Sequence, residues 1–226
     1  MGPVSRAPRQ YHFPDDRPRL RGVSHQYAAW AFAAAFAVLV ALAPDWAGRG
    51  WVAAHAVGIT GMLVSSAVYH RAAVSPTARH RLRRLDHSAI QLAIAGSYTG
   101  VAGLALEGTH RTVMLAIVWA AALTGIGLRL FVFDGLHPLI GASYIAVGWV
   151  ALVDAPTLVD HLTGGQFALL LSGGVMYTVG ALVLAVRRPN PWPAVFGFHE
   201  IFHALVVAAA ACHVLITWWL LVDRRH

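Results

Sequence analysis

Two histidines near the C-terminal end of the chain are spaced for metal chemistry. His199 and His203 lie four residues apart, at the start of an apolar run that reaches Val222. Residues four apart share one face of an α-helix, and two histidines at this spacing are a recurrent zinc-binding arrangement. Ionisable side chains inside a membrane helix are functional candidates by default. The pair therefore predicts a metal centre, and other helices must supply its remaining ligands.

The composition indicates a multi-pass membrane protein. Of the 226 residues, 58% are hydrophobic and 12% are charged, whereas about a quarter of a soluble domain is charged. All 17 basic residues are arginine, and this usage, with alanine-rich helices, predicts a bacterial source and the bacterial cell (inner) membrane. The net charge of +7 does not require a nucleic-acid partner, because membrane proteins concentrate arginine in cytoplasmic loops. The single cysteine, Cys212, excludes an intramolecular disulfide and a cysteine metal cluster.

Seven apolar blocks follow one another, each near the roughly 20 residues that cross a bilayer as a helix. We therefore expect an all-α integral membrane protein, a seven-transmembrane-helix bundle over residues 25–226. Residues 1–24 are rich in arginine and proline and predict a disordered basic cytoplasmic arm. The least certain boundary is between the fourth and fifth blocks, where Arg129 and Asp134 interrupt the apolar run. The expected spans are about 27–43, 51–70, 87–106, 112–131, 136–153, 166–186 and 197–222.

The arginines orient this bundle. With the N-terminus inside, thirteen of the 17 arginines fall in inner segments and four in outer ones. This bias follows the positive-inside rule and predicts a cytoplasmic N-terminus. An odd number of spans then places the C-terminus outside.

The same topology brings five polar residues to one level near the inner leaflet. Ser66 and His70 end the second block, Asp86 opens the third, and His199 and His203 open the seventh. Three neutral imidazoles and an open fourth position are typical of catalytic zinc, which makes bound water a nucleophile near pH 7. We predict that His70, His199 and His203 hold Zn²⁺. Asp86 would orient the water or take its proton, and Ser66 would hydrogen-bond the water or a substrate carbonyl.

Structural roles are the alternative for single members of this set. A lone membrane histidine is more often an interhelical hydrogen-bond partner than a ligand, which applies to His70 taken alone. Asp86 taken alone is explained as a helix N-cap with Arg83 or Arg84 as counter-ion. His87 points about 100° away from Asp86 around a helix, which makes it a poor fourth ligand.

The other histidines are not expected to join the site. His55 lies near the opposite leaflet and predicts a packing or hydrogen-bonding role. His213 is about 15 Å along the helix axis from His203, too far to share an ion. The remaining histidines fall in predicted loops or tails and are expected to be solvated: His12, His25, His80, His110, His137, His161 and His226.

Four motifs in order resemble the hemolysin III family, which is related to the progestin and adipoQ receptors and more distantly to alkaline ceramidases. They are SAVYH (66–70), LDHSAI (85–90), IAGSYT (94–99) and HEIFH (199–203). The resemblance covers roughly residues 20–222. Gly100 stands where the family pattern has a proline, which affects the shape of the third helix more than the metal site.

The resemblance implies a seven-helix bundle with the N-terminus inside and zinc near the cytoplasmic side. His70, His199 and His203 match the family's zinc ligands. Asp86 matches a residue that reaches zinc through water, and Ser66 matches the serine beside it. The implied activity is hydrolysis of a ceramide-like lipid amide, so the partner would be a membrane lipid. Family members are also described as receptors, membrane-homeostasis factors or haemolysins, which keeps a non-enzymatic receptor or pore-forming role open.

A third reading uses the same helix differently. HEIFH (199–203) fits the metalloprotease pattern H-E-x-x-H, in which the glutamate is the general base. An intramembrane zinc protease would then use Glu200, with Asp134 as a distant ligand. That reading leaves Ser66, His70 and Asp86 unexplained. Glu200 lies about 100° around the helix from His199, so we expect it to pack or to support a ligand.

Overall fold

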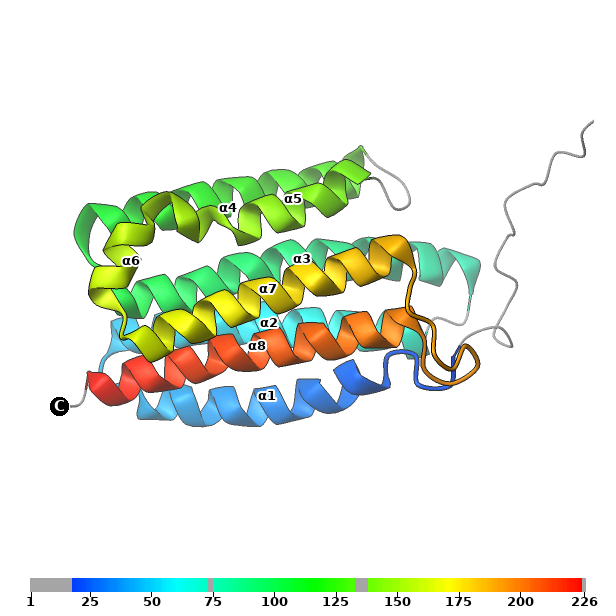
Figure 1. Cartoon of the computed structure of the whole chain (residues 1–226), viewed down its shortest axis with the longest axis horizontal. Coiled ribbons are helices and arrows are strands. Elements are labelled where there is room, and N and C mark those ends of the chain that lie inside the picture. The colour runs from blue at the N-terminus through cyan, green and yellow to red at the C-terminus, as the bar shows by residue number, and fades with distance from the viewer. Residues whose placement is uncertain (1–17, 73–74, 133–137, 225–226) are drawn as a thin grey trace, which may run out of the picture.

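The computed structural model describes residues 18–72, 75–132 and 138–224, and these ranges are helical apart from short connections. The only strand-like pairing within them is an isolated bridge between Trp192 and Phe196. The helices, shown in Figure 1, are α1 (Val23–Leu42), α2 (Trp46–Arg71), α3 (Pro76–Ala105), α4 (Gly108–Phe131), α5 (Pro138–Gly148), a 3₁₀ turn (Val150–Asp154), α6 (Ala155–His161), α7 (Gly164–Val186) and α8 (Phe198–Asp223).

Six of these segments are long and apolar enough to cross a membrane: α1, α2, α4, the α5–α6 unit, α7 and α8. The seventh rod is α3, which is 30 residues long and packs along α2 more extensively than any other pair of helices packs. Its first turns carry four arginines, which lower its mean hydropathy although its remainder is apolar. Within the described ranges, the chain is therefore an all-helical, multi-pass membrane protein with seven long helical rods, counting α5–α6 as one.

The third helix begins eleven residues before the predicted start at residue 87. Its N-cap is Ser75, whose hydroxyl accepts a hydrogen bond of 3.1 Å from the Ala78 N–H. Pro76 occupies the first turn, where the missing N–H of a proline costs nothing. The interpretation of Asp86 as an N-cap is therefore wrong, because Asp86 lies well inside α3.

The fifth span also differs from its predicted end at residue 153. The helix tightens into the 3₁₀ turn and continues as α6 to His161. Pro156 stands in the first turn of α6, where a proline is tolerated. Between the fourth and fifth spans, Asp134 lies outside the described residues, as do residues 1–17 of the predicted arm. Residues 18–22 are part of the structure, and Val23 begins α1.

Glycines fix the distance between α2 and α3, because small residues let the backbones of membrane helices approach closely. A Cβ atom on Gly96 would lie 2.8 Å from the Ala54 carbonyl oxygen, and one on Gly100 would lie 2.7 Å from the His55 Cβ. Real Cβ atoms essentially never approach other atoms so closely. The two backbones therefore meet directly, which fixes where Ser66 and His70 lie relative to Asp86.

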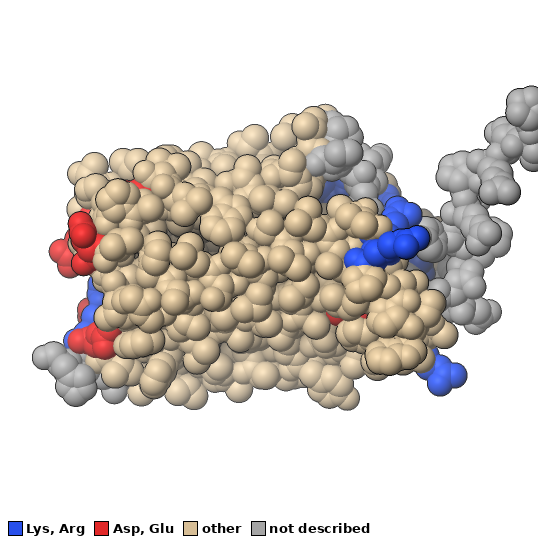
Figure 2. Space-filling view, viewed as in Figure 1, with Lys and Arg blue, Asp and Glu red and all other residues tan. Residues whose placement is uncertain are grey.

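The two ends of the bundle carry different charge. Figure 2 shows arginines gathered where α3 and α8 begin, acidic residues together with some arginine at the opposite end, and a largely uncharged belt between them. Large hydrophobic side chains such as Trp30, Val57 and Leu182 are exposed on the sides of the rods. This surface fits a lipid environment, and the histidines that begin α8 belong to the arginine-rich end.

Candidate metal centre

Three histidines from two helices meet at the arginine-rich end of the bundle. His70 comes from the last turn of α2, and His199 and His203 come from the first two turns of α8. One nitrogen from each ring can be chosen so that all three lie within 4.8 Å of one another. The centroids of the three rings are 4.6 to 5.0 Å apart. The structure therefore brings the three predicted ligands together as a group that could hold a metal ion.

The spacing of these nitrogens fits a small tetrahedral ion. The Nε2 atoms of His70 and His199 are 3.3 Å apart. Two imidazole nitrogens at zinc-binding distance in a tetrahedral site lie about 3.3 Å from each other. His203 is 2% exposed, and His70 and His199 are half-buried. The donor set, three imidazoles, is one that zinc accepts.

The start of α8 is built around Glu200. One carboxylate oxygen accepts a hydrogen bond of 2.8 Å from the Gly197 N–H, which caps the helix. The other accepts a hydrogen bond of 2.5 Å from Arg21 Nε, and Glu200 is 3% exposed. Both oxygens are thus committed to the fold. Glu200 sets the position of the first turn of α8, from which His199 and His203 project.

Asp86 and Ser66 lie side by side in the buried interior. Ser66 of α2 is 3% exposed and Asp86 of α3 is 8% exposed. The Ser66 hydroxyl hydrogen-bonds the Asp86 carboxylate. The group of mutually close ligand atoms consists of His70, His199 and His203 and does not include Asp86. His87, expected to be a poor ligand, is also outside that group.

Arg129 was expected only as an inner-leaflet charge, yet it is 1% exposed. Its guanidinium, from α4, interacts electrostatically with Asp86. Nearby, the Tyr144 hydroxyl donates to the His87 carbonyl over 2.9 Å and ties α5 to α3. One feature of the sequence could have indicated a buried Arg129: it is a single arginine within an otherwise apolar run.

His25 was expected in a solvated tail, and this expectation is wrong. The residue belongs to α1, is 2% exposed, and stacks on His203 with ring centroids 3.8 Å apart and planes 10° apart. The signal that could have found it is helical periodicity. His25 shares its buried face with Ala28, Ala29 and Phe36, but the predicted apolar span begins two residues later, at residue 27.

The remaining histidines in the described ranges lie apart from this group. His55 is fully buried and hydrogen-bonds Thr217, which confirms its predicted role. His213 packs against Tyr177. His110 and His161 are exposed, and His80 is half-buried. His12, His137 and His226 lie outside the described residues.

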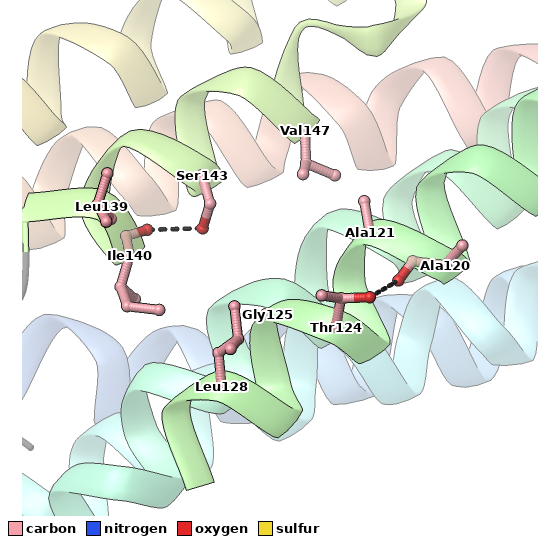
Figure 3. Close-up of a pocket in the computed structure, with 9 residues that line it drawn as sticks. All are labelled: Ala120, Ala121, Thr124, Gly125, Leu128, Leu139, Ile140, Ser143 and Val147. Carbon is pink, nitrogen blue, oxygen red and sulfur yellow. Dashed lines mark hydrogen bonds between the residues drawn. The ribbon is translucent and has the colours of Figure 1, made fainter. Parts of the chain in front are cut away.

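A surface hollow lies elsewhere, between α4 and α5 (Figure 3). Its cavity volume is about 480 Å³, and none of the predicted site residues lines it. Its two hydroxyls, on Thr124 and Ser143, donate to carbonyl groups of their own helices. The hollow is an apolar surface without reactive groups.

The chain is similar to proteins of one family. A family model described as "Haemolysin-III related" matches residues 13–214. The chain is 37% identical over 127 residues to Hemolysin-3 of Bacillus cereus, covering 56% of this chain and 55% of the relative. It is 34% identical over 130 residues to the Hemolysin-3 homolog of Bacillus subtilis (strain 168), covering 58% of each.

A more distant relative is the adiponectin receptor protein of Drosophila melanogaster, 27% identical over 146 residues, covering 58% of this chain and 33% of the relative. The match spans little more than half the length of the two bacterial relatives. The family model, in contrast, covers most of the chain, including all three clustered histidines. On this evidence the chain belongs to the haemolysin-III-related family of multi-pass membrane proteins.

Proposed function

We propose that this protein is a zinc-dependent hydrolase that cleaves the amide bond of ceramide-like membrane lipids. The observation that carries the proposal is the group of three histidines, of which His203 is buried, with His70 Nε2 and His199 Nε2 3.3 Å apart. Three protein ligands leave one position of a tetrahedral ion open, which is typical of catalytic rather than structural zinc. Zn²⁺ is therefore the proposed cofactor, and His70, His199 and His203 are its proposed ligands.

The proposed setting is the inner leaflet of the bacterial cell membrane. The N-terminus would be cytoplasmic and the C-terminus outside, because the arginines gather at the end of the bundle that holds the histidines (Figure 2). A membrane lipid reaches this level without leaving the bilayer. The scissile amide of a ceramide lies near the headgroup region, which is the depth proposed for the site.

The residues around the histidines divide the chemistry between them. A zinc ion bound there would supply a Lewis acid and a water nucleophile at neutral pH. The Asp86 carboxylate would accept the proton of that water and return it to the amine that leaves when the amide bond breaks. The Ser66 hydroxyl, which hydrogen-bonds Asp86, would fix the direction of the carboxylate. The Arg129 guanidinium would offset its buried negative charge.

The protease alternative asks Glu200 to act as general base. Both Glu200 oxygens are already bound, one by the Gly197 N–H and one by Arg21. The alternative also gives no role to Asp86 and Ser66. We therefore regard Glu200 as a residue that holds the start of α8.

The second candidate is a non-enzymatic role, as a lipid receptor, a membrane-homeostasis factor or a pore-forming protein. The similarity to an adiponectin receptor protein and to Hemolysin-3 supports it. Such a protein would use the histidines and zinc to hold a ligand or a conformation. It predicts zinc binding without turnover, and this separates it from the hydrolase.

The two candidates are separated by an assay of the purified, zinc-loaded chain with ceramide, a lysophospholipid and an N-acyl amide. We expect the protein to release fatty acid from the ceramide, and mass spectrometry would measure this release. Asp86→Asn should lower the rate by at least about 100-fold, the loss typical of a missing general base, while bound zinc is unchanged. Asp160→Asn, at an exposed aspartate, is the matched control and should retain the rate.

Three outcomes would count against the hydrolase. Zinc bound without release from any of these substrates favours the receptor or pore-forming role. Full activity in Asp86→Asn removes that residue from the mechanism. Loss of activity in Glu200→Gln, with zinc retained and a protein substrate cleaved by the wild type, favours the protease.

A further inference from the structure

The segment just before α1 forms one wall of the histidine group. Gly22 adopts a left-handed conformation with φ +75°, and a Cβ at this position would lie 2.8 Å from the His70 Cβ. Only glycine meets both demands, because other residues are strained at positive φ and carry the Cβ that would clash. The backbone of this segment therefore lies directly against His70.

Three further contacts hold the segment in place. The Arg19 N–H donates to the Ala194 carbonyl over 3.0 Å, and the Leu20 N–H donates to the Val195 carbonyl over 3.2 Å. The Arg21 guanidinium pairs with Glu200 in the first turn of α8. These contacts join the start of α1 to the loop before α8, 170 or more residues away in sequence, as Figure 1 also shows.

These contacts place the His25 ring against the His203 ring. The two rings are 3.8 Å apart and nearly parallel, at 10°, and His25 is 2% exposed. Imidazole lone pairs lie in the plane of the ring. An ion bound in the plane of His203 would thus be displaced from the plane of His25 by about the separation of the rings. His25 is also absent from the group of mutually close ligand atoms, so the geometry makes it a neighbour of a ligand.

We propose that His25 is a positioning residue of the metal centre. Its ring restricts His203 to one orientation by stacking, while Gly22 and the Arg21–Glu200 pair hold the backbone that presents it. Ligands held in place before the ion arrives lose less freedom on binding, so zinc affinity rises. The inference rests on the proposed zinc centre and adds a residue outside its motifs.

The test is the zinc dissociation constant of the purified full chain, measured by competition with a chromogenic chelator. His25→Ala should weaken zinc binding about 10-fold, the lower end of losses on removing a ligand's support. His25→Phe keeps a flat ring and should bind within about twofold of wild type. His213→Ala, at a half-buried histidine that is not part of the group, is the matched control and should leave the constant unchanged.

Two results would overturn the positioning role of His25. Wild-type affinity in His25→Ala overturns the positioning role. Binding as weak in His25→Phe as in His25→Ala also overturns it, because the nitrogens and not the ring face would then matter. Cobalt absorption spectra separate these cases, since the ligand set should be identical in wild type and His25→Phe. If the wild-type chain binds no zinc, the metal centre fails, which is a different result.

Discussion

Buried or half-buried histidines occur in two regions of this bundle, and their surroundings differ. In the first, away from the arginine-rich end and called the middle region here, His55 Nδ1 of α2 lies 3.0 Å from Thr217 Oγ1 of α8. The Thr217 hydroxyl donates to the His213 carbonyl over 3.1 Å, so His55 Nδ1 must be the donor of the first bond. At the arginine-rich end, His70 and His199 instead face each other through Nε2 atoms 3.3 Å apart, and His203 is beside them.

This contrast shows that burial alone does not mark a metal site. The middle region satisfies a histidine nitrogen with a hydroxyl, which is the ordinary way a membrane protein ties two helices together. The end region turns several basic nitrogens toward one point. A bound cation would explain why these nitrogens lie so close together. Three predictions test this difference, beginning with the largest effect.

The largest expected effect is the loss of zinc-dependent stabilisation in His199→Ala. A ligand that binds only the folded state stabilises it by about 2.7 kcal/mol at 100 times its dissociation constant. Thermal unfolding of the detergent-solubilised protein, with and without zinc, measures this gain. We expect the gain in wild type and in His55→Ala, from a lower starting stability, and none in His199→Ala. If zinc still stabilises His199→Ala but no longer stabilises His55→Ala, the metal would lie in the middle region, which would contradict the comparison.

A smaller effect is expected when the middle region loses its hydroxyl. Thr217→Val keeps the shape of the side chain but removes the acceptor of His55 Nδ1. Hydrogen bonds of this kind between membrane helices contribute about 0.6 kcal/mol on average, so we expect a modest fall in unfolding free energy. Zinc affinity should not change. A weaker zinc affinity in Thr217→Val would mean that the two regions are coupled.

The residues of the candidate site could be predicted because the order of the spans predicts the depth of each residue in the membrane. Helical spacing put His199 and His203 on one face, and the order of the spans put His70 at the same level. The structure brings these three together as the sequence predicts, and the Ser66–Asp86 contact likewise joins two residues expected at that level. Their chemical roles remain predictions.

The parts that were missed depend on contacts that a linear pattern does not contain. The predicted first span begins after His25. In the structure α1 begins earlier, because its start is fixed by Gly22 against His70 and by pairing with the loop before α8. The first turns of α3 resembled a basic loop. Arginine is a good helix former, and the Ser75 cap lets the helix begin there.

The most direct test of the metal centre is the metal content of the purified wild-type chain against that of His70→Ala, by elemental mass spectrometry. His70 supplies the only ligand from outside α8, so its loss should leave two histidines that cannot retain the ion. We predict about one zinc per wild-type chain and close to none in His70→Ala, with His213→Ala retaining the wild-type content. Equal zinc in wild type and His70→Ala would contradict the site.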